Sequence, residues 1–463
     1  MYKVVPYHGR CDSYCRCRKG TILVITAIVL IALVGLLGLV IDAGQLMTAH
    51  RTVQNAADAG ATAAALDMLT GRSNSVATSS ATSFVQQHNG LSAATVIVRI
   101  PPTSGHHVGD SRYVEVLVSN SVPMRFIQVL GVGSSRTVTA RSVANWEGTA
   151  VGAGVIALDR DARPGVRLTG NGSLKVNGTV LVNSEGGGLN ESGQPINNGG
   201  SGNAITTVGN GSLYARDVVS VGGVNNISKI KNYDTSNPQS PLHTGSVVIP
   251  DPFQYLASPT TFNGAVATNF GAVKLSGNQN VTLSPGVYTS IQTSANVNVY
   301  LNPGIYIIAG GGITMTGNST LTGDGVMLYN TGSDYNANTG LPDSGDGTSA
   351  PPASGNPTFG GLSITGNARL DLTPFSNPSS PFDGMVVYQR RLNTQELKLA
   401  GNGSSDVLTG TVYAKWAPID LSGNGTFNSQ FVVKEVKFTG NGTLTLDVTG
   451  QPLARSLQVF LVE

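Results

Sequence analysis

A run of 20 apolar residues near the start of the chain most constrains what it can fold into. Ile22 to Ile41 (ILVITAIVLIALVGLLGLVI) contains one hydroxyl group, on Thr26, and no charge. At about 1.5 Å per residue, a helix of this length crosses a hydrocarbon core of roughly 30 Å. A cleaved signal peptide is the alternative, but its apolar stretch usually has about 7–15 residues. Ala43-Gly44 is only a weak cleavage site. We therefore expect residues 22–41 to be a retained transmembrane helix.

Charges around this run predict its orientation. Residues 1–21 form a basic tail with five cationic side chains, whereas Asp42 follows the run directly; the five are Lys3, Arg10, Arg16, Arg18 and Lys19. Because basic residues are retained on the cytoplasmic side, we expect a single-pass protein with a cytoplasmic N-terminus and its bulk outside. The formal net charge is only +2, which gives no electrostatic reason to expect a nucleic-acid partner.

The three cysteines, Cys11, Cys15 and Cys17, all precede the apolar run. The rest of the chain therefore has no intramolecular disulfide. A C-x3-C-x-C cluster has the donor type for a metal, with His8 as the nearest further ligand, and it is also open to acylation. Because no fourth ligand has the usual spacing, we expect neither a metal nor any other cofactor.

Residues 42–71 predict a continuation of the helix. They are rich in alanine, the best helix former, and contain no proline. Their apolar residues recur at roughly helical spacing, and Gly71 is a plausible stop.

A motif in this region resembles a known family. Arg18-Lys19-Gly20, the apolar run, Asp42-Ala43-Gly44, Arg51 and the segment 53–59 (VQNAADA) together resemble the N-terminal module of TadE/TadG-like Flp pilus-assembly proteins. The region from about residue 270 onward is similar to a Gly-Asn repeat region of some proteins with this anchor. The resemblance implies a protein of a bacterial cytoplasmic (inner) membrane, near pilus or tight-adherence machinery. It also implies that residues 43–69 contact pilus-assembly or secretion proteins.

Two departures limit what the resemblance carries. Pilin-like members have a Glu five residues after the cleaved Gly, whereas here Ile25 stands five residues after Gly20. We therefore do not expect polymerisation as a pilin. The D-x-S-x-S metal motif of the larger members is missing, so metal-dependent adhesion is not expected either.

Residues 72–150 predict a small α+β segment. Ser75 to His88 has a helical pattern, and Pro123 to Leu130 is compatible with a second helix that begins at proline. Three segments alternate like strands: Thr95 to Ile100, Arg112 to Ser119 and Ser135 to Ala144.

Residues 151–463 are organised by a recurring Gly-Asn turn between alternating apolar segments. The glycines of these turns are Gly170, Gly209, Gly277, Gly317, Gly366, Gly401, Gly423 and Gly440. Gly adopts positive φ freely and Asn tolerates it. Recurrence near every 20 residues predicts a β-solenoid, right-handed and β-helix-like, whose stacked Asn amides form ladders. The longer intervals contain either two coils or a loop. A β-sandwich or jelly roll is the alternative.

The sequence offers no catalytic motif. It has no G-x-S-x-G, H-E-x-x-H, P-loop or G-x-G-x-x-G, and the acidic residues Asp371, Asp383, Asp406 and Asp420 are scattered. Residues 388–391 (YQRR) are compatible with a sugar or phosphate site or with a polar corner. We name no catalytic, cofactor or metal residues.

The mainly β chain is therefore expected to be a non-enzymatic, membrane-anchored accessory of pilus assembly or surface adhesion. The alternative is an anchored module for surface glycans, bound through the loops 184–203 and 330–359, since loops that leave one face of a solenoid often carry function. A polysaccharide-degrading β-helix has only fold-level analogy behind it.

Overall fold

The computed structural model describes residues 21–462 apart from 70–71, 127, 129–132, 147, 151, 197–200, 261–266, 343–357, 379, 404–406 and 458. The basic tail and the three cysteines lie outside this range. The chain forms two compact units, Met1–Trp146 together with Val459–Glu463, and Glu147–Gln458. The last five residues thus belong to the first unit, although the sequence pattern assigned them to the solenoid.

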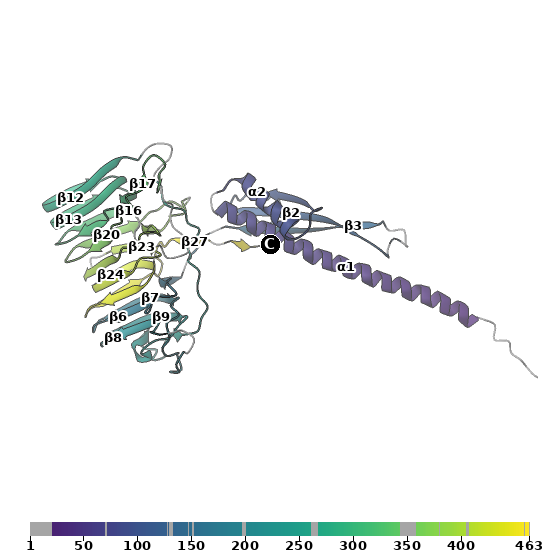
Figure 1. The fold of residues 1–463 in the computed structure, drawn as a ribbon, viewed down its shortest axis with the longest axis horizontal. Helices are drawn as coiled ribbons and strands as arrows, with labels where there is room; N and C mark the ends of the chain where they lie inside the picture. Colours follow the sequence, from purple (N-terminus) through teal and green to yellow (C-terminus); the bar gives the residue numbers. More distant parts are fainter. Residues whose placement is uncertain are drawn as a thin grey trace, which may run out of the picture. The chain divides into compact units, whose positions relative to one another are not determined.

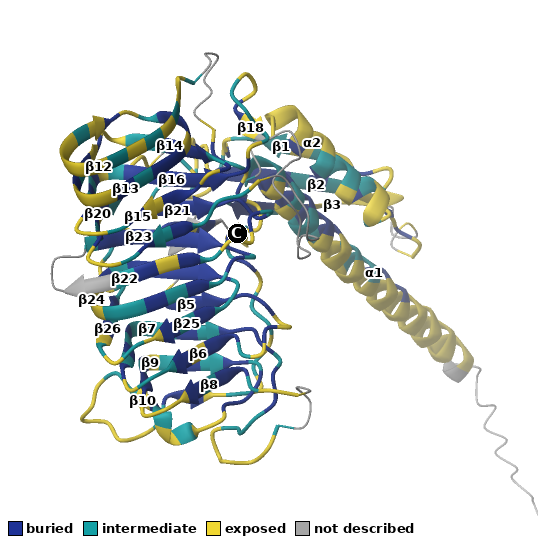
Figure 2. Ribbon diagram, turned by 60° about the vertical axis from the view of Figure 1, so that its left-hand side comes forward, coloured by how far each residue is buried: buried dark blue, intermediate teal, exposed yellow. Residues whose placement is uncertain are grey.

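One unbroken helix, α1 (Thr21–Leu69, 49 residues), contains the predicted transmembrane segment 22–41 and residues 42–69 of its predicted continuation; residues 70–71 lie outside the described chain. Between residues 23 and 41 its side chains are exposed, with Gly38 as the single buried position (Figure 2). Its second half is amphipathic and buries a face of small residues: Val53, Ala56, Ala57, Gly60, Ala61, Ala64 and Ala65. Small side chains let the helix backbone approach the neighbouring sheet closely.

That sheet has four antiparallel strands in the order β1-β2-β3-β28. Their bounds are β1 (Thr95–Arg99), β2 (Tyr113–Pro123), β3 (Ser135–Asn145) and β28 (Phe460–Leu461). The predicted helix at Ser75 to His88 corresponds to α2 (Asn74–Ser83) followed by a π-helical turn, η1 (Phe84–His88). The helix predicted to begin at Pro123 is wrong at its start, because Pro123 is the last residue of β2 and pairs with Ser135. Pairing with β3 therefore extends β2 to this residue, where the sequence pattern predicted the start of a helix.

The second unit confirms the mainly β, β-helix-like fold. Its ladder strands pair in parallel, with a few local register shifts, whereas the alternative sandwich requires antiparallel neighbours. The ladder strands are β5 (Ala153–Ala157), β6 (Val166–Thr169), β7 (Ser173–Val182), β8 (Ile205–Val208), β9 (Ser212–Ser220), β10 (Ile230–Asn232), β11 (Leu242–His243), β12 (Asn269–Leu283), β13 (Gly286–Leu301), β14 (Gly304–Ala309), β15 (Ile313–Met315), β16 (Thr320–Thr331), β19 (Leu362–Ile364), β20 (Arg369–Pro374), β21 (Met385–Gln389), β22 (Leu397–Gly403), β23 (Val407–Ala414), β24 (Ile419–Val433), β25 (Val436–Thr439) and β26 (Thr443–Asp447).

Short elements complete this unit. They are a 3-10 turn, η3 (Ile227–Lys229), and two antiparallel pairs, β4 (Gly148–Ala150) with β27 (Arg455–Leu457) and β17 (Tyr335–Asn336) with β18 (Leu341–Pro342).

The coils do not stack in sequence order. The chain enters at β5 in the middle of the ladder and runs outward through β7 and β9 to β10 and β11. It then crosses to the opposite end, where β12 begins a second run of coils that returns to β24, β25 and β26. These last strands pair with the first ones, as β24–β5, β25–β6 and β26–β7. Figure 1 shows this as green β12 at one end, yellow strands in the middle and blue-green β8 and β9 at the other end.

The predicted asparagine ladder is present. Asn296 donates from Nδ2 to Oδ1 of Asn278 at 2.9 Å, Asn318 donates to Asn296 at 2.9 Å, and Asn367 donates to Asn318 at 3.1 Å. The column includes Asn296, which follows Ala295 and not a glycine. Ala295 is the one non-glycine residue of the described chain with a positive φ, 66°. The 40-residue interval in the turn pattern is therefore two coils, and the sequence motif missed the corner between them.

Two apolar clusters stabilise the unit. The larger one fills the inside of the coils, from Val155 and Leu168 to Leu446. The smaller one lies on an outer face and includes Ile156, Tyr329, Tyr388 and Tyr413. It also includes Phe253 and Leu256, which belong to the crossover strap, the described residues 244–260 that lead from β11 toward β12.

Candidate functional site

The anchor module is the part of the molecule with the clearest functional signature. Of its motif residues, Val53, Ala56 and Ala57 are fully buried against the sheet of the first unit. Gln54 donates from Nε2 to the Arg141 carbonyl at 3.2 Å and to Oδ1 of Asp58 at 2.8 Å. These residues hold α1 on the sheet, so packing alone accounts for them.

Within the helical part of the motif, Arg51 and residues 53–59, the exposed residues are Arg51 and Asn55. They lie four positions apart and thus on one face of α1. Packing within the unit does not account for them, which makes this face the candidate contact surface of the motif.

Asp42, at the end of the apolar run, is 2% exposed. Its carboxylate accepts the backbone N–H of Arg125 at 3.2 Å and of Phe126 at 2.9 Å. One helical turn earlier, Gly38 lies under the Phe126 ring, and a Cβ at Gly38 would come within 2.7 Å of the Phe126 Cβ. Asp42 and Gly38 therefore hold the described end of the β2–β3 connection against α1. The sequence analysis used Asp42 only for orientation and for the family resemblance, and it predicted neither contact.

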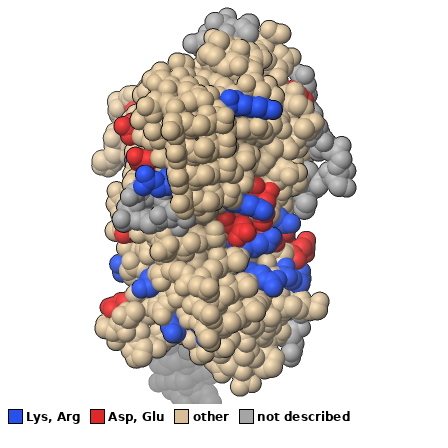
Figure 3. All heavy atoms as spheres, turned by 90° about the vertical axis from the view of Figure 1, so that its left-hand side faces the viewer, with Lys and Arg blue, Asp and Glu red and all other residues tan. Residues whose placement is uncertain are grey.

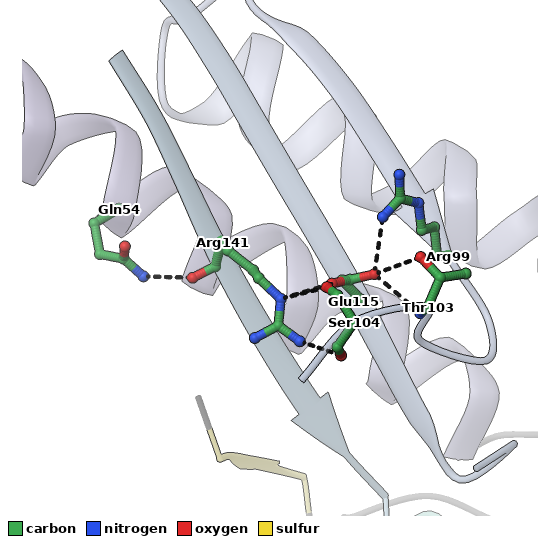
Figure 4. Close-up of polar contacts among 6 residues, drawn as sticks. All are labelled: Gln54, Arg99, Thr103, Ser104, Glu115 and Arg141. Atoms are coloured by element: carbon green, nitrogen blue, oxygen red, sulfur yellow. Dashed lines mark hydrogen bonds and ion pairs between the residues drawn. The ribbon is translucent and has the colours of Figure 1, made fainter. Parts of the chain in front are cut away.

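Glu115 is the centre of a buried ionic cluster on the same sheet (Figure 4). Its side chain is 0% exposed, and Oε1 accepts from Nε of Arg141 at 2.6 Å. Oε2 accepts from Arg99 at 3.3 Å and from the backbone N–H of Thr103 at 3.2 Å, and the Ser104 hydroxyl also donates to the carboxylate. These contacts tie the loop between β1 and β2 to the sheet.

Burial by itself raises the pKa of Glu115, but the donors around it have the larger effect. Hydrogen bonds from Ser104, Arg141, Thr103 and Arg99 lower this pKa from 4.5 to about 2. The group is therefore a permanently ionised structural element at neutral pH. The sequence pattern of alternating residues at Arg112 to Ser119 gave no sign of it, because its partners come from three separate segments.

The loops proposed for ligand binding lie at coil corners of the solenoid. In the loop 184–203, of which residues 197–200 lie outside the described chain, Leu189 and Val224 exchange two backbone hydrogen bonds, at 2.8 and 2.9 Å, and Ser184 is fully buried. Of the loop 330–359, residues 343–357 lie outside the described chain, and the described part contains the β17–β18 pair. No ligand-binding arrangement follows from these contacts.

Residues 388–391 (YQRR) are buried and bind neighbouring segments of the solenoid, so they do not form an open site. Arg390 is fully buried and its Nη1 lies 2.6 Å from Oδ1 of Asp334. Arg391 donates from Nη2 to the carbonyls of Phe253 at 2.6 Å and Leu256 at 2.9 Å, both in the crossover strap. Of the two interpretations left open by the sequence, a structural corner fits these contacts.

A hydrogen-bonded network completes the attachment of the strap. The Tyr413 hydroxyl donates to Oδ2 of Asp251 at 2.8 Å and accepts from Nε of Arg391 at 2.8 Å. Lys415 lies 3.2 Å from the same Asp251 oxygen. Burial raises the pKa of Tyr413 well above its usual range, with the Asp251 charge adding to the effect. Nearer β7, Asn183 exchanges two hydrogen bonds with Ile249, at 2.7 and 2.9 Å.

The scattered acidic residues do not assemble. Asp371 lies on β20, Asp420 lies on β24, and Asp383 accepts the Asn377 N–H at 2.7 Å in a loop; Asp406 lies outside the described residues. Within the described chain no three His, Cys, Asp or Glu side chains lie close enough to hold a metal ion. On the face shown in Figure 3, most of the surface is uncharged, and acidic and basic side chains gather in one mixed cluster near its middle.

The solenoid contains a polar cleft with charged walls, of about 530 Å³. Arg216, Arg455, Asp383 and Asn177 are among its lining residues. Arg216 donates from Nε to Oδ1 of Asn177 at 2.6 Å and stacks over the Tyr233 ring. This arrangement can hold a polar or anionic group, and sequence reasoning did not find it because its residues come from five separate segments of the chain.

Helix α1 is long and apolar enough to cross a membrane, and its apolar part is almost entirely unburied in the molecule. Comparison with known proteins agrees with this feature. The family model described as putative Flp pilus-assembly TadE/G-like matches residues 20–67, about a tenth of the chain. Neither the curated proteins nor the solved structures contain a match to the chain. The N-terminal helical region is thus similar to TadE/G-like pilus-assembly proteins.

Proposed function

We propose that this chain is a non-enzymatic, single-pass protein of a bacterial cytoplasmic membrane that serves Flp pilus assembly or tight adherence. The observation that carries the proposal is the TadE/G-like match over α1. The same helix has a lipid-compatible first half and a second half packed on its own sheet. Such a helix anchors a folded unit directly at a membrane surface.

The orientation rests on the charges that flank the helix. Five basic residues precede it, and Asp42 follows, so the N-terminus is cytoplasmic and both folded units are extracytoplasmic. The solenoid lacks cysteine and needs no disulfide in that compartment.

The partners of the proposal are pilus-assembly or secretion proteins, contacted through residues 43–69. The exposed motif residues Arg51 and Asn55 support this assignment, because the fold uses their motif neighbours for internal packing.

Site-specific photocrosslinking in the native host tests the proposal. A photoreactive amino acid at Arg51 or Asn55 is expected to capture Flp pilus-assembly components, identified by mass spectrometry. The matched control is Val247, which is 84% exposed on the solenoid. Equal capture from Val247, or no pilus component from either motif position, would contradict the role of this helix.

A second candidate function is glycan binding in the polar cleft, favoured by the two arginines that line it. Arg216→Ala removes one cationic wall and is expected to weaken binding of the full chain to acidic glycans on an array. Arg163→Ala, an arginine of the same unit that is absent from the cleft lining, is the control. An array without signal for the unmodified protein would remove this candidate.

A further inference from the structure

We infer that the first unit touches the membrane at a second point, the end of the β2–β3 connection at Arg125 and Phe126, which inserts into the lipid interface beside α1. The inference rests on the membrane span proposed above. It adds a lipid-contacting element outside the transmembrane helix.

The first step is the depth of Phe126 along the helix. Its ring covers Gly38, which lies three residues before Ile41, the end of the apolar run. At about 1.5 Å per residue, this places the ring roughly 5 Å inside the apolar segment. A bilayer that covers the helix up to Ile41 therefore also reaches Phe126.

The second step is the rigidity of this placement. The carboxylate of Asp42 accepts the N–H groups of both Arg125 and Phe126, and Met124, the preceding residue, is 1% exposed. The backbone from Met124 to the Phe126 N–H is therefore held against α1, which places the Phe126 side chain beside Gly38.

The third step is the surface that remains. Phe126 is 42% exposed although it is fixed, and Arg125 beside it is exposed. An aromatic ring at the boundary of the hydrocarbon, with a long cationic side chain able to extend toward headgroup phosphates, is the composition that membrane interfaces favour. The lipid bilayer is the occupant that continuity with the apolar helix assigns to this surface.

Fluorescence quenching by lipids tests the inference in the full-length protein. Cys11, Cys15 and Cys17 are replaced by serine, and a single cysteine carrying an environment-sensitive dye replaces Phe126, Leu33 or Val108. Leu33 lies in the apolar half of α1, and Val108 is 59% exposed in the loop between β1 and β2. The protein is reconstituted in phosphatidylethanolamine–phosphatidylglycerol vesicles containing nitroxide-labelled lipids.

We expect the labels at Phe126 and Leu33 to lose emission and the label at Val108 to keep it. Quenching at Leu33 with none at Phe126 would overturn the second contact and leave the anchor intact. Absence of quenching at Leu33 would overturn the anchor and, with it, this inference.

A matched pair of variants separates insertion from general proximity. A Cβ at Gly38 would lie 2.7 Å from the Cβ of residue 126, an atom that the labelled cysteine keeps, so Gly38→Leu displaces this position, whereas a Cβ at Gly35 meets no atom within 4 Å. Gly38→Leu is expected to abolish quenching of the Phe126 label and to spare that of Leu33, and Gly35→Leu to change neither. Equal quenching of the Phe126 label in both variants would contradict the contact at Gly38.

Discussion

Glu115 and Asp110 both have a pKa lowered to about 2, for different physical reasons. Asp110 is paired with Arg112, two residues away on the surface, and this local pair is also accessible to the unfolded chain. The buried cluster of Glu115 joins β1, β2, β3 and the loop between β1 and β2, and unfolding separates these segments. Only the ionisation of Glu115 therefore makes a large contribution to folding.

We predict that Glu115→Gln destabilises the first unit by about 3 kcal/mol, because the variant leaves a buried, cation-rich site without its anion. Asp110→Asn is the control and is expected to change stability by less than about 1 kcal/mol, as for an exposed pair. Unfolding is followed by Trp146 fluorescence in a Trp416→Phe background. Equal destabilisation by both substitutions would contradict the structural role of Glu115.

The same cluster predicts a pH dependence. The pKa of Glu115 is lower in the folded state, so its contribution is complete above about 4.5 and declines as the pH falls toward about 2. At about 1.4 kcal/mol per pH unit between the two pKa values, the loss approaches roughly 3 kcal/mol. Trp146 unfolding curves between these pH values should show this decline in the unmodified protein and a weaker one in Glu115→Gln. If the stability of both proteins declined equally with falling pH, the assigned contribution of Glu115 would be contradicted.

The asparagine column is a second feature at the residue scale. Asn318 donates one side-chain hydrogen bond and accepts another, whereas Asn278 at the end of the column only accepts. With about 0.5–1.5 kcal/mol for each bond, Asn318→Ala should destabilise the solenoid about twice as much as Asn278→Ala. Thermal unfolding monitored by circular dichroism at strand wavelengths measures this difference. A larger effect at Asn278 would argue against a ladder.

At the scale of elements, the crossover strap is held on the outside of the coils by buried polar contacts. Tyr413→Phe removes the hydroxyl that joins Asp251 to Arg391. We expect faster proteolysis within residues 244–260, because a buried carboxylate and guanidinium each lose a partner. Tyr306→Phe also removes a hydroxyl hydrogen bond, to the carbonyls of Leu283 and Asn302, but away from the strap. Faster cleavage of the strap in both variants would show that Tyr413 has no specific role there.

A sequence pattern predicts an element when the residues that specify it are close neighbours in the chain. The apolar run, the alanine-rich helix and the alternating strands follow from patterns within a few neighbouring residues, as in Val96 to Arg99 of β1 or Val273 and Leu275 of β12. Ala295 escaped prediction because the stack holds an alanine where the local pattern expects glycine. The Glu115 cluster and the Phe126–Gly38 contact escaped because each joins residues that lie in different strands or helices.

At the scale of the whole molecule, the strands that come first in the solenoid sequence pair with those that come last, in the middle of the stack. The Gly-Asn turns recur with the same two residues in distant coils, so the motif does not indicate the stacking order. The order is fixed by the strap and by the pairs β24–β5, β25–β6 and β26–β7.

Cutting the strap tests this pairing. A protease site inserted after Val247, which is 84% exposed, would yield fragments that remain joined by three pairs of parallel strands, by the antiparallel pairs β4–β27 and β3–β28, and by a shared apolar core. We expect the two fragments to elute together in native gel filtration and to separate in denaturant. Separation under native conditions would show that the pairs between first and last coils do not hold the coils together.

The central claim is that α1 anchors the chain in a membrane with the folded units outside the cytoplasm, and cysteine labelling in spheroplasts tests it most directly. A membrane-impermeant maleimide is applied to the unmodified protein, whose cysteines are Cys11, Cys15 and Cys17, and to Val247→Cys in a background with these three replaced by serine. We predict that Val247→Cys is labelled in intact spheroplasts, that the native cysteines are labelled only after lysis, and that both proteins remain in the membrane pellet after alkaline washing. Labelling of the native cysteines before lysis, protection of Val247→Cys, or release into the wash would contradict the account.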